Sequence, residues 1–133
     1  MKRLSGLKLL EEREGAGTTA SKGDRVVFHM RLFLNKDDEV PLNETQAKHL
    51  PKEMIQTVNG STFVDRTIVL GRREVIAGVD HALIGMKVGG YRKVRISPHL
   101  AYRGNGIPGL IPPDSVLICE IQLRKIESLS SVE

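Results

Sequence analysis

A regular alternation of apolar with other side chains is the feature that most constrains the fold of this chain. Residues 25–34 alternate with a period of two, which predicts a β-strand with one fully apolar face. That face consists of Val26, Phe28, Met30, Leu32 and Leu34. The sequence predicts further strands at 7–10, 62–70, 92–96 and 117–123. A chain with several half-apolar strands must bury one face of a sheet.

One segment has a helical period instead. Its apolar residues recur at the spacing that aligns them on one stripe of a helix: Val79, Ala82, Leu83 and Met86. This pattern predicts a helix over 79–86 that ends at Gly89-Gly90. Several strands with one short helix favour the α+β class, with a curled antiparallel sheet wrapped around the helix. The length of 133 residues predicts one domain, 1–133.

Residues 101–113 form the most distinctive segment, because they contain three of the six prolines and three of the thirteen glycines. Proline fixes φ and glycine permits positive φ, so together they predict a long surface loop of defined shape. Its other residues are unusually apolar for a loop: Tyr102, Ile107, Leu110 and Ile111. Two interpretations remain open. The loop forms one wall of a binding pocket, or it folds back to cover the core.

Composition argues against several classes of protein. The chain has no apolar run near the ~20 residues that cross a bilayer, and its basic start lacks the apolar core of a signal peptide. We therefore expect no membrane partner. The single cysteine fits a reducing compartment, which favours the cytoplasm.

The charge pattern points to no nucleic-acid or metal partner. The net charge is +4, but the basic residues are spread along the chain, and the small clusters at 72–73 and 91–95 are typical of solvated strand faces. With two Tyr, three Phe and no Trp, there are few platforms on which bases could stack. The histidines have no spacing typical of metal ligands. We expect no metal and no cofactor.

Five segments in the same order resemble a known family. Residues 101–113 resemble the loop pattern AYG-x-x-G-x-PG-x-IPP of the FKBP-type (tacrolimus-binding) peptidyl-prolyl cis-trans isomerases. Residues 70–80 resemble its LG-x-x-EVI-x-G-aromatic-acidic motif, and 86–90 resemble M-x-VGE. Residues 96–98 and 117–126 resemble the strand that leads into the loop and the closing strand. The resemblance covers about residues 23–127.

The resemblance implies an enzyme that isomerises X–Pro bonds in protein chains and thereby assists folding. Its implied partners are proline-containing peptides or unfolded chains, and tacrolimus-like ligands. It implies two donors to substrate carbonyls, the backbone N–H of Ile76 and the hydroxyl of Tyr102. It also implies a set of substrate-binding side chains: His29, Val75, Val79, Ile107, Leu110, Ile111 and Cys119.

Three of these positions depart from the family pattern. Val79 stands where the family usually has Trp, His29 where it has Tyr, and Cys119 where it has Phe. A smaller floor gives a less complete pocket, so we expect low activity and weak binding of tacrolimus-like ligands. Two alternatives remain open, a non-catalytic peptide-binding module and a chaperone-like folding helper. His29 is interpreted as a pocket donor or as a satisfied strand histidine, and Cys119 as a substrate contact or as a small core residue.

Residues 35–61 are longer than the matching part of the family and form an insertion. After a turn at 35–38, Asn43 and Gln46 have the spacing of a capping box, and Pro51 suits a first helical position. We expect one or two helical turns, followed by a turn at Asn59-Gly60. The insertion is interpreted as a solvated excursion or as a lid or partner surface beside the pocket. Asp65 is a candidate for the acidic position of the family's pocket.

Overall fold

The computed structural model describes residues 5–34 and 38–127, so most of the predicted turn at 35–38 lies outside the described residues. The elements in chain order are β1 (Leu7–Arg13), β2 (Arg25–Leu34), β3 (Asp38–Glu39), α1 (Leu42–Ala47), the 3-10 helix η1 (Lys52–Met54), β4 (Ile55–Val58), β5 (Ser61–Val64), β6 (Arg66–Val69), α2 (Ala77–Leu83), β7 (Tyr91–Ile96), the 3-10 helix η2 (Pro98–Leu100) and β8 (Leu117–Glu127).

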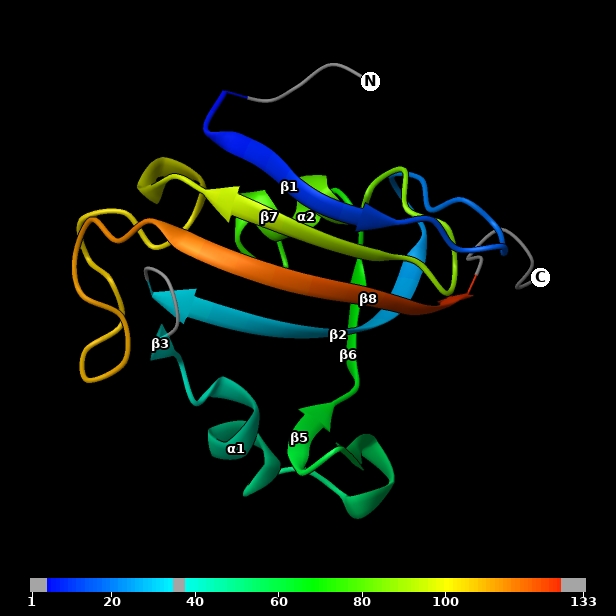
Figure 1. The fold of residues 1–133 in the computed structure, drawn as a ribbon, viewed down its shortest axis with the longest axis horizontal. Coiled ribbons are helices and arrows are strands. Elements are labelled where there is room, and N and C mark those ends of the chain that lie inside the picture. Colours follow the sequence, from blue (N-terminus) through cyan, green and yellow to red (C-terminus); the bar gives the residue numbers. More distant parts are fainter. Residues whose placement is uncertain (1–4, 35–37, 128–133) are drawn as a thin grey trace.

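The main sheet confirms the predicted architecture. Its strands run in the order β1-β7-β8-β2-β3, and β6 pairs with the first part of β2. Every pairing is antiparallel. Helix α2 packs behind β7 and β8, while the insertion with α1 and β5 projects beyond the β2 edge of the sheet (Figure 1). The chain is thus a curled antiparallel sheet around one short helix, with an insertion after the first long strand.

The core lies between the concave face of the sheet and α2. The alternation in β2 predicted its inward face correctly, because Val26, Phe28, Met30 and Leu32 are all buried. The helix contributes Val79 and Leu83, and β8 contributes Leu117, Ile121 and Leu123 to the same apolar cluster. Burial of this continuous apolar surface is the main stabilising term for such a layer.

Helix α2 begins and ends earlier than predicted. It spans Ala77–Leu83, whereas the apolar stripe predicted 79–86. The helix ends because Ile84 is extended and Gly85 has a φ of +92°, a value that glycine adopts without strain. Met86 is nevertheless buried, since the turn at Gly85 folds it back onto the core. The predicted stop at Gly89-Gly90 was therefore wrong.

Strand β1 is longer than predicted. The predicted strand ended at residue 10, but residues 11–13 also pair with β7, where Glu12 lies opposite Arg92 and Arg13 opposite Tyr91. The Glu12 carboxylate lies 2.6 Å from Nε of Arg92, and the guanidinium of Arg13 stacks over the ring of Tyr91. Glu12 and Arg92 are 80 positions apart in the sequence, so local composition could not reveal this pairing.

The predicted strand at 62–70 is two strands that belong to different sheets. β5 pairs with β4 in a small separate hairpin, β6 pairs with β2, and the break falls at Asp65. Residues 55–58, which belong to the segment expected to contain one or two helical turns, form β4. The turn at Asn59-Gly60 is confirmed, with φ values of +51° and +81° that suit a tight hairpin turn.

The insertion contains the expected helical turns, but its predicted caps were wrong. Pro41 takes the N-cap position of α1 and no side chain caps the helix. Asn43 points inward instead and is buried, where it bonds to the backbone of β2. Pro51 stands just before η1 rather than in its first position.

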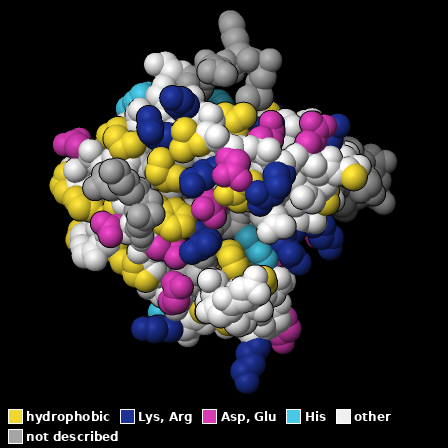
Figure 2. All heavy atoms as spheres, viewed as in Figure 1, with side chains coloured by type: hydrophobic (Ala, Val, Ile, Leu, Met, Phe, Trp, Pro, Cys, Tyr) yellow, Lys and Arg dark blue, Asp and Glu magenta, His cyan; other side chains and the backbone are white. Residues whose placement is uncertain are grey.

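On the outer face of the sheet, positive and negative side chains lie interspersed (Figure 2). There Arg31 bonds Glu39 on the neighbouring strand. Arg92 lies on the opposite face of β7, where it bonds Glu12 and donates to the carbonyls of Ala82 and Ile84 at the end of α2. Within the described residues, no helix combines the length and the hydrophobicity needed to cross a bilayer.

Candidate functional site

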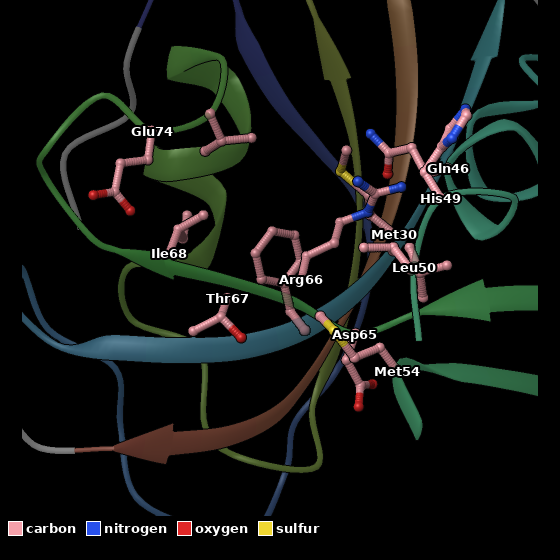
Figure 3. Close-up of a pocket in the computed structure, with 13 residues that line it drawn as sticks. Met30, Gln46, His49, Leu50, Met54, Asp65, Arg66, Thr67, Ile68 and Glu74 are labelled. Atoms are coloured by element: carbon pink, nitrogen blue, oxygen red, sulfur yellow. The ribbon is translucent and has the colours of Figure 1, made fainter. Parts of the chain in front are cut away.

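A cavity of about 400 Å³ lies between the main sheet and the insertion (Figure 3). Its walls come from β2, from the insertion, from the segment around β6, and from the turn before α2. The lining residues are Phe28, Met30, Gln46, His49, Leu50, Met54, Val64, Asp65, Arg66, Thr67, Ile68, Glu74 and Val75. This volume is in the range of ligand sites. The insertion is therefore a wall of the cavity, which favours the interpretation as a surface beside the pocket over that of a plain excursion.

Arg66 brings a positive charge into this mostly apolar space. It lies opposite Phe28 in the pairing of β6 with β2, and side chains opposite each other in a sheet share a face. Because Phe28 points into the core, Arg66 does as well. Its Nη2 donates a 2.9 Å hydrogen bond to Oδ1 of Asn43, while its Nε is buried and has no partner among the described residues. Burial lowers the pKa of the guanidinium, and the neighbouring Tyr102 and Cys119 oppose that shift.

Asp65 lines the cavity, but its carboxylate points away from Arg66 and towards His29 on the outer face of the sheet. Its Oδ1 accepts a 2.7 Å hydrogen bond from Nε2 of His29, whose ring stacks on Phe63 at 5.2 Å. Burial lowers the pKa of His29, and the bond to Asp65 partly offsets this. His29 is thus a satisfied strand histidine, and it does not line the cavity.

Ile76 and Val75 lie where α2 begins. Of the residues predicted for the site, Val75 and the candidate acid Asp65 line the cavity. The carbonyl of Ile76 accepts the N–H groups of Val79 and Asp80 at 3.0 and 3.1 Å. Among the described residues, no acceptor takes the N–H of Ile76 itself. This donor is therefore open to a ligand.

Tyr102 and the long loop pack against the same core cluster as Val75 and Ile76. The loop is closed by paired backbone hydrogen bonds between Ile107 and Ile111, both 2.8 Å. Burial raises the pKa of Tyr102, and its hydroxyl bonds no described residue. Ile111 is buried, whereas Ile107 and Leu110 are partly exposed. The loop thus covers part of the core. None of its residues lines the cavity described above, so its role as a wall of a binding pocket stays a prediction.

Val79 and Cys119 are completely buried in the core. Burial raises the pKa of the Cys119 thiol, which is consistent with a small core residue. Neither side chain lines the cavity, so their contact with substrate stays a prediction.

The sequence reasoning missed Arg66 and the cavity walls supplied by Phe28, Met30 and the insertion. A signal for Arg66 was present. It occupies the position between Val64 and Ile68 in an otherwise apolar alternation, so it had to point inward. The inward turn of Asn43 had no such signal, because the same residue at the same place also fits a cap.

Comparison with known proteins agrees with this geometry. Residues 16–124 match the model of a family described as FKBP-type peptidyl-prolyl cis-trans isomerase. FK506-binding protein 1A of Neurospora crassa is 31% identical, over 98% of this chain and 96% of its own length. The 46 kDa FK506-binding nuclear protein of Spodoptera frugiperda is 33% identical over 92% of this chain and 26% of its own length. Peptidyl-prolyl cis-trans isomerase FKBP9 of Bos taurus is 34% identical over 71% of this chain and 20% of its length.

The structure combines a curled antiparallel sheet on a short helix with two hydrogen-bond donors. One donor is the open N–H at the start of that helix, and the other is the phenol on the proline-rich loop. This combination is that of a class of peptide-binding isomerase folds. The chain belongs to the FKBP-type peptidyl-prolyl cis-trans isomerases. It spans nearly all of one relative and about a quarter of the longer ones. Its activity is that of the family, the isomerisation of X–Pro bonds.

Proposed function

We propose that this chain isomerises X–Pro bonds in flexible or unfolded protein chains, at a rate below that expected of a complete FKBP pocket. The observation that carries the proposal is the pair of open donors, the N–H of Ile76 and the hydroxyl of Tyr102, beside apolar residues of one core cluster. Such donors bind the carbonyls on either side of a proline while the X–Pro amide bond rotates.

The reaction needs neither an acid nor a base. Resonance keeps the amide planar, and rotation faces a barrier of ~18–20 kcal/mol. The twisted amide has less charge separation than the planar one, so an apolar surface favours it relative to water. Preferential binding of the twisted form lowers the barrier without a covalent step. Ile107 and Leu110, partly exposed on the loop, are suited to this surface.

Two features support a reduced rate. Val79 offers a far smaller surface than the aromatic ring usual at this position, and it is withdrawn into the core. Arg66 places a charged group beside Tyr102, which makes this region more polar. A loss of transition-state stabilisation of ~1.4–2.8 kcal/mol lowers a rate by 10–100-fold. The same features support weak binding of tacrolimus-like ligands.

A second candidate function is peptide binding without turnover, as in a folding helper. The observation that favours it is the cavity wall formed by the insertion, where Leu50 and Met54 offer apolar contacts for a non-native chain. In this case the cavity binds the peptide, and the region around Ile76 does not catalyse isomerisation of an X–Pro bond.

Exchange spectroscopy by NMR on an Ala-Pro peptide distinguishes the two functions, because it reports binding and isomerisation in one sample. We expect a cis–trans exchange rate that rises linearly with protein concentration. Peptide shifts that change on binding, with an exchange rate equal to that of free peptide, would establish the binding module instead.

We also propose a cytoplasmic location. The support is the single cysteine, which suits a reducing compartment. A fluorescent fusion checks this, and secretion of the fusion would contradict it.

A further inference from the structure

We propose that Arg66 makes this site selective for prolyl peptides that carry an oxyanion on a residue next to the proline. The oxyanion is a carboxylate of Asp or Glu, or the phosphate of a phosphorylated residue. This inference rests on the proposed isomerase function and names its substrate class.

The first observation is a charge without a counter-charge. Other partly buried arginines of this chain are paired, since Arg31 lies 2.8 Å from a carboxylate oxygen of Glu39 and Arg92 lies 2.6 Å from one of Glu12. Among the described residues, no carboxylate lies within 4.0 Å of the Arg66 guanidinium, and its Nε has no partner. A cation that is partly withdrawn from water, with no anion beside it, is unfavourable, so an anionic ligand group would be bound favourably at this position.

The second observation is that Arg66 is fixed in place. Oδ1 of Asn43 accepts the bond from Nη2 of Arg66, and Nδ2 of the same Asn43 donates to the carbonyl of Met30 at 3.0 Å. The amide is neutral, so it orients the guanidinium without neutralising it. A cation that is already oriented loses little conformational freedom when it binds a ligand.

The third observation concerns the other charged groups of the cavity. Asp65 is bonded to His29 and lies 4.0 Å from Nε of Arg124, and Glu74 accepts the N–H of Val69. Figure 3 shows Glu74 at the opposite end of the cavity from Arg66, and the carboxylate of Asp65 directed away from it. Both acids are therefore engaged elsewhere and leave the Arg66 end of the cavity positive.

Gln46 adds a neutral donor at this end. Its amide lies at the same end of the cavity as Arg66 (Figure 3) and makes no side-chain hydrogen bond to a described residue. An oxyanion can accept from a guanidinium and an amide together, and charge-assisted bonds of this kind are about twice as strong as neutral ones. The surrounding Met30, Leu50 and Met54 suit the apolar part of the peptide.

The test uses matched peptides of one length that differ only at the residue before or after the proline. This residue is Ala, Gln, Glu, Lys or phosphoserine, and kcat/KM and Kd are measured for each by NMR. For the wild-type protein we expect Glu to exceed Gln by about tenfold in kcat/KM in at least one of the two positions. Added salt should reduce this ratio. The Glu and phosphoserine peptides distinguish a carboxylate from a phosphate as the preferred anion.

Variants assign the preference to Arg66. Arg66→Met should bring the ratio of Glu to Gln close to one, Arg66→Lys should retain part of it, and the exposed Arg95→Met serves as the matched control that keeps it. Thermal unfolding confirms that each variant folds. If Arg66→Met does not fold, the ratio in the wild-type protein and its response to salt decide the matter.

The outcomes separate this inference from the proposed function. Equal kcat/KM and Kd for Glu and Gln peptides, with clear turnover of the Ala peptide, would overturn the inference and leave the isomerase intact. Turnover of none of the peptides would overturn the isomerase, and the ratio of Kd values would then still decide the role of Arg66. A preference that survives in Arg66→Met would also overturn the inference.

Discussion

Arg66 and Asn43 are joined by a 2.9 Å hydrogen bond from Nη2 to Oδ1 that links β6 to α1 across 23 positions of the sequence. Because Asn43 also bonds the carbonyl of Met30, this one amide connects the insertion with two strands of the main sheet. The insertion is thereby part of the site and not an appendage of it.

Replacing Asn43 by Ala should destabilise the protein by roughly 2–3 kcal/mol. The substitution leaves the carbonyl of Met30 and one N–H of Arg66 without partners in a buried setting, and each such group costs ~1–3 kcal/mol. Unfolding in urea measures the change in free energy. Glu44→Ala, on the exposed side of the same helix, is the control. A change at Asn43 no larger than at Glu44 would argue against this network.

Tyr102→Phe should lower kcat/KM by about threefold to tenfold while the protein stays folded. The hydroxyl bonds no described residue, so its loss removes a bond to substrate and no bond within the fold. The other tyrosine, Tyr91, lies on the outer face of the sheet beneath Arg13 and supplies the matched control. If Tyr91→Phe and Tyr102→Phe give the same rate, Tyr102 has no role as a donor.

Met54→Ser should weaken peptide binding by about fivefold or more with little effect on stability. Its side chain is partly exposed and lines the cavity, so it loses contact with a ligand more than with the core. Val58→Ser is the control, because Val58 is 48% exposed at the end of β4, the strand that follows Met54. Isothermal titration with a proline peptide gives both dissociation constants. Unchanged affinity in Met54→Ser would mean that the insertion takes no part in binding.

Stability should fall as the pH decreases below about 6.5, the ordinary pKa of histidine. Burial lowers the pKa of His29 in the folded protein, so the unfolded chain takes up the proton first and is favoured as the solution becomes acidic. Asp65 moderates this effect, while Arg124 and Arg66 strengthen it. The loss grows until the pH has passed the folded pKa and then levels off.

His29→Gln should flatten this pH dependence, and urea unfolding at several pH values between 7.5 and about 5 measures it. His81 is exposed on α2, so His81→Gln should leave the slope of the wild-type protein unchanged. A slope in His29→Gln equal to that of the wild type would assign the effect to another group.

The sequence by itself determined the sheet, the helix and the family. The alternation in 25–34 identified the inward face of β2, since side-chain direction in a strand follows from position alone. The spacing of Val79, Ala82 and Leu83 identified the buried face of the helix, whereas the helix ends were not predicted correctly, and Met86 lies beyond the helix. The proline and glycine pattern of 101–113 specified the loop, because both residues restrict the backbone locally.

Only the tertiary structure decided what fills the site. Hydrogen bonds between residues far apart in the sequence accompany the break at Asp65, the position of Arg66 and the inward turn of Asn43. His29 shows the same limit, because its face of β2 is covered by Phe63 from a hairpin that local patterns did not predict. A period of two tells which way a side chain points, but what it meets there depends on segments that the fold brings together.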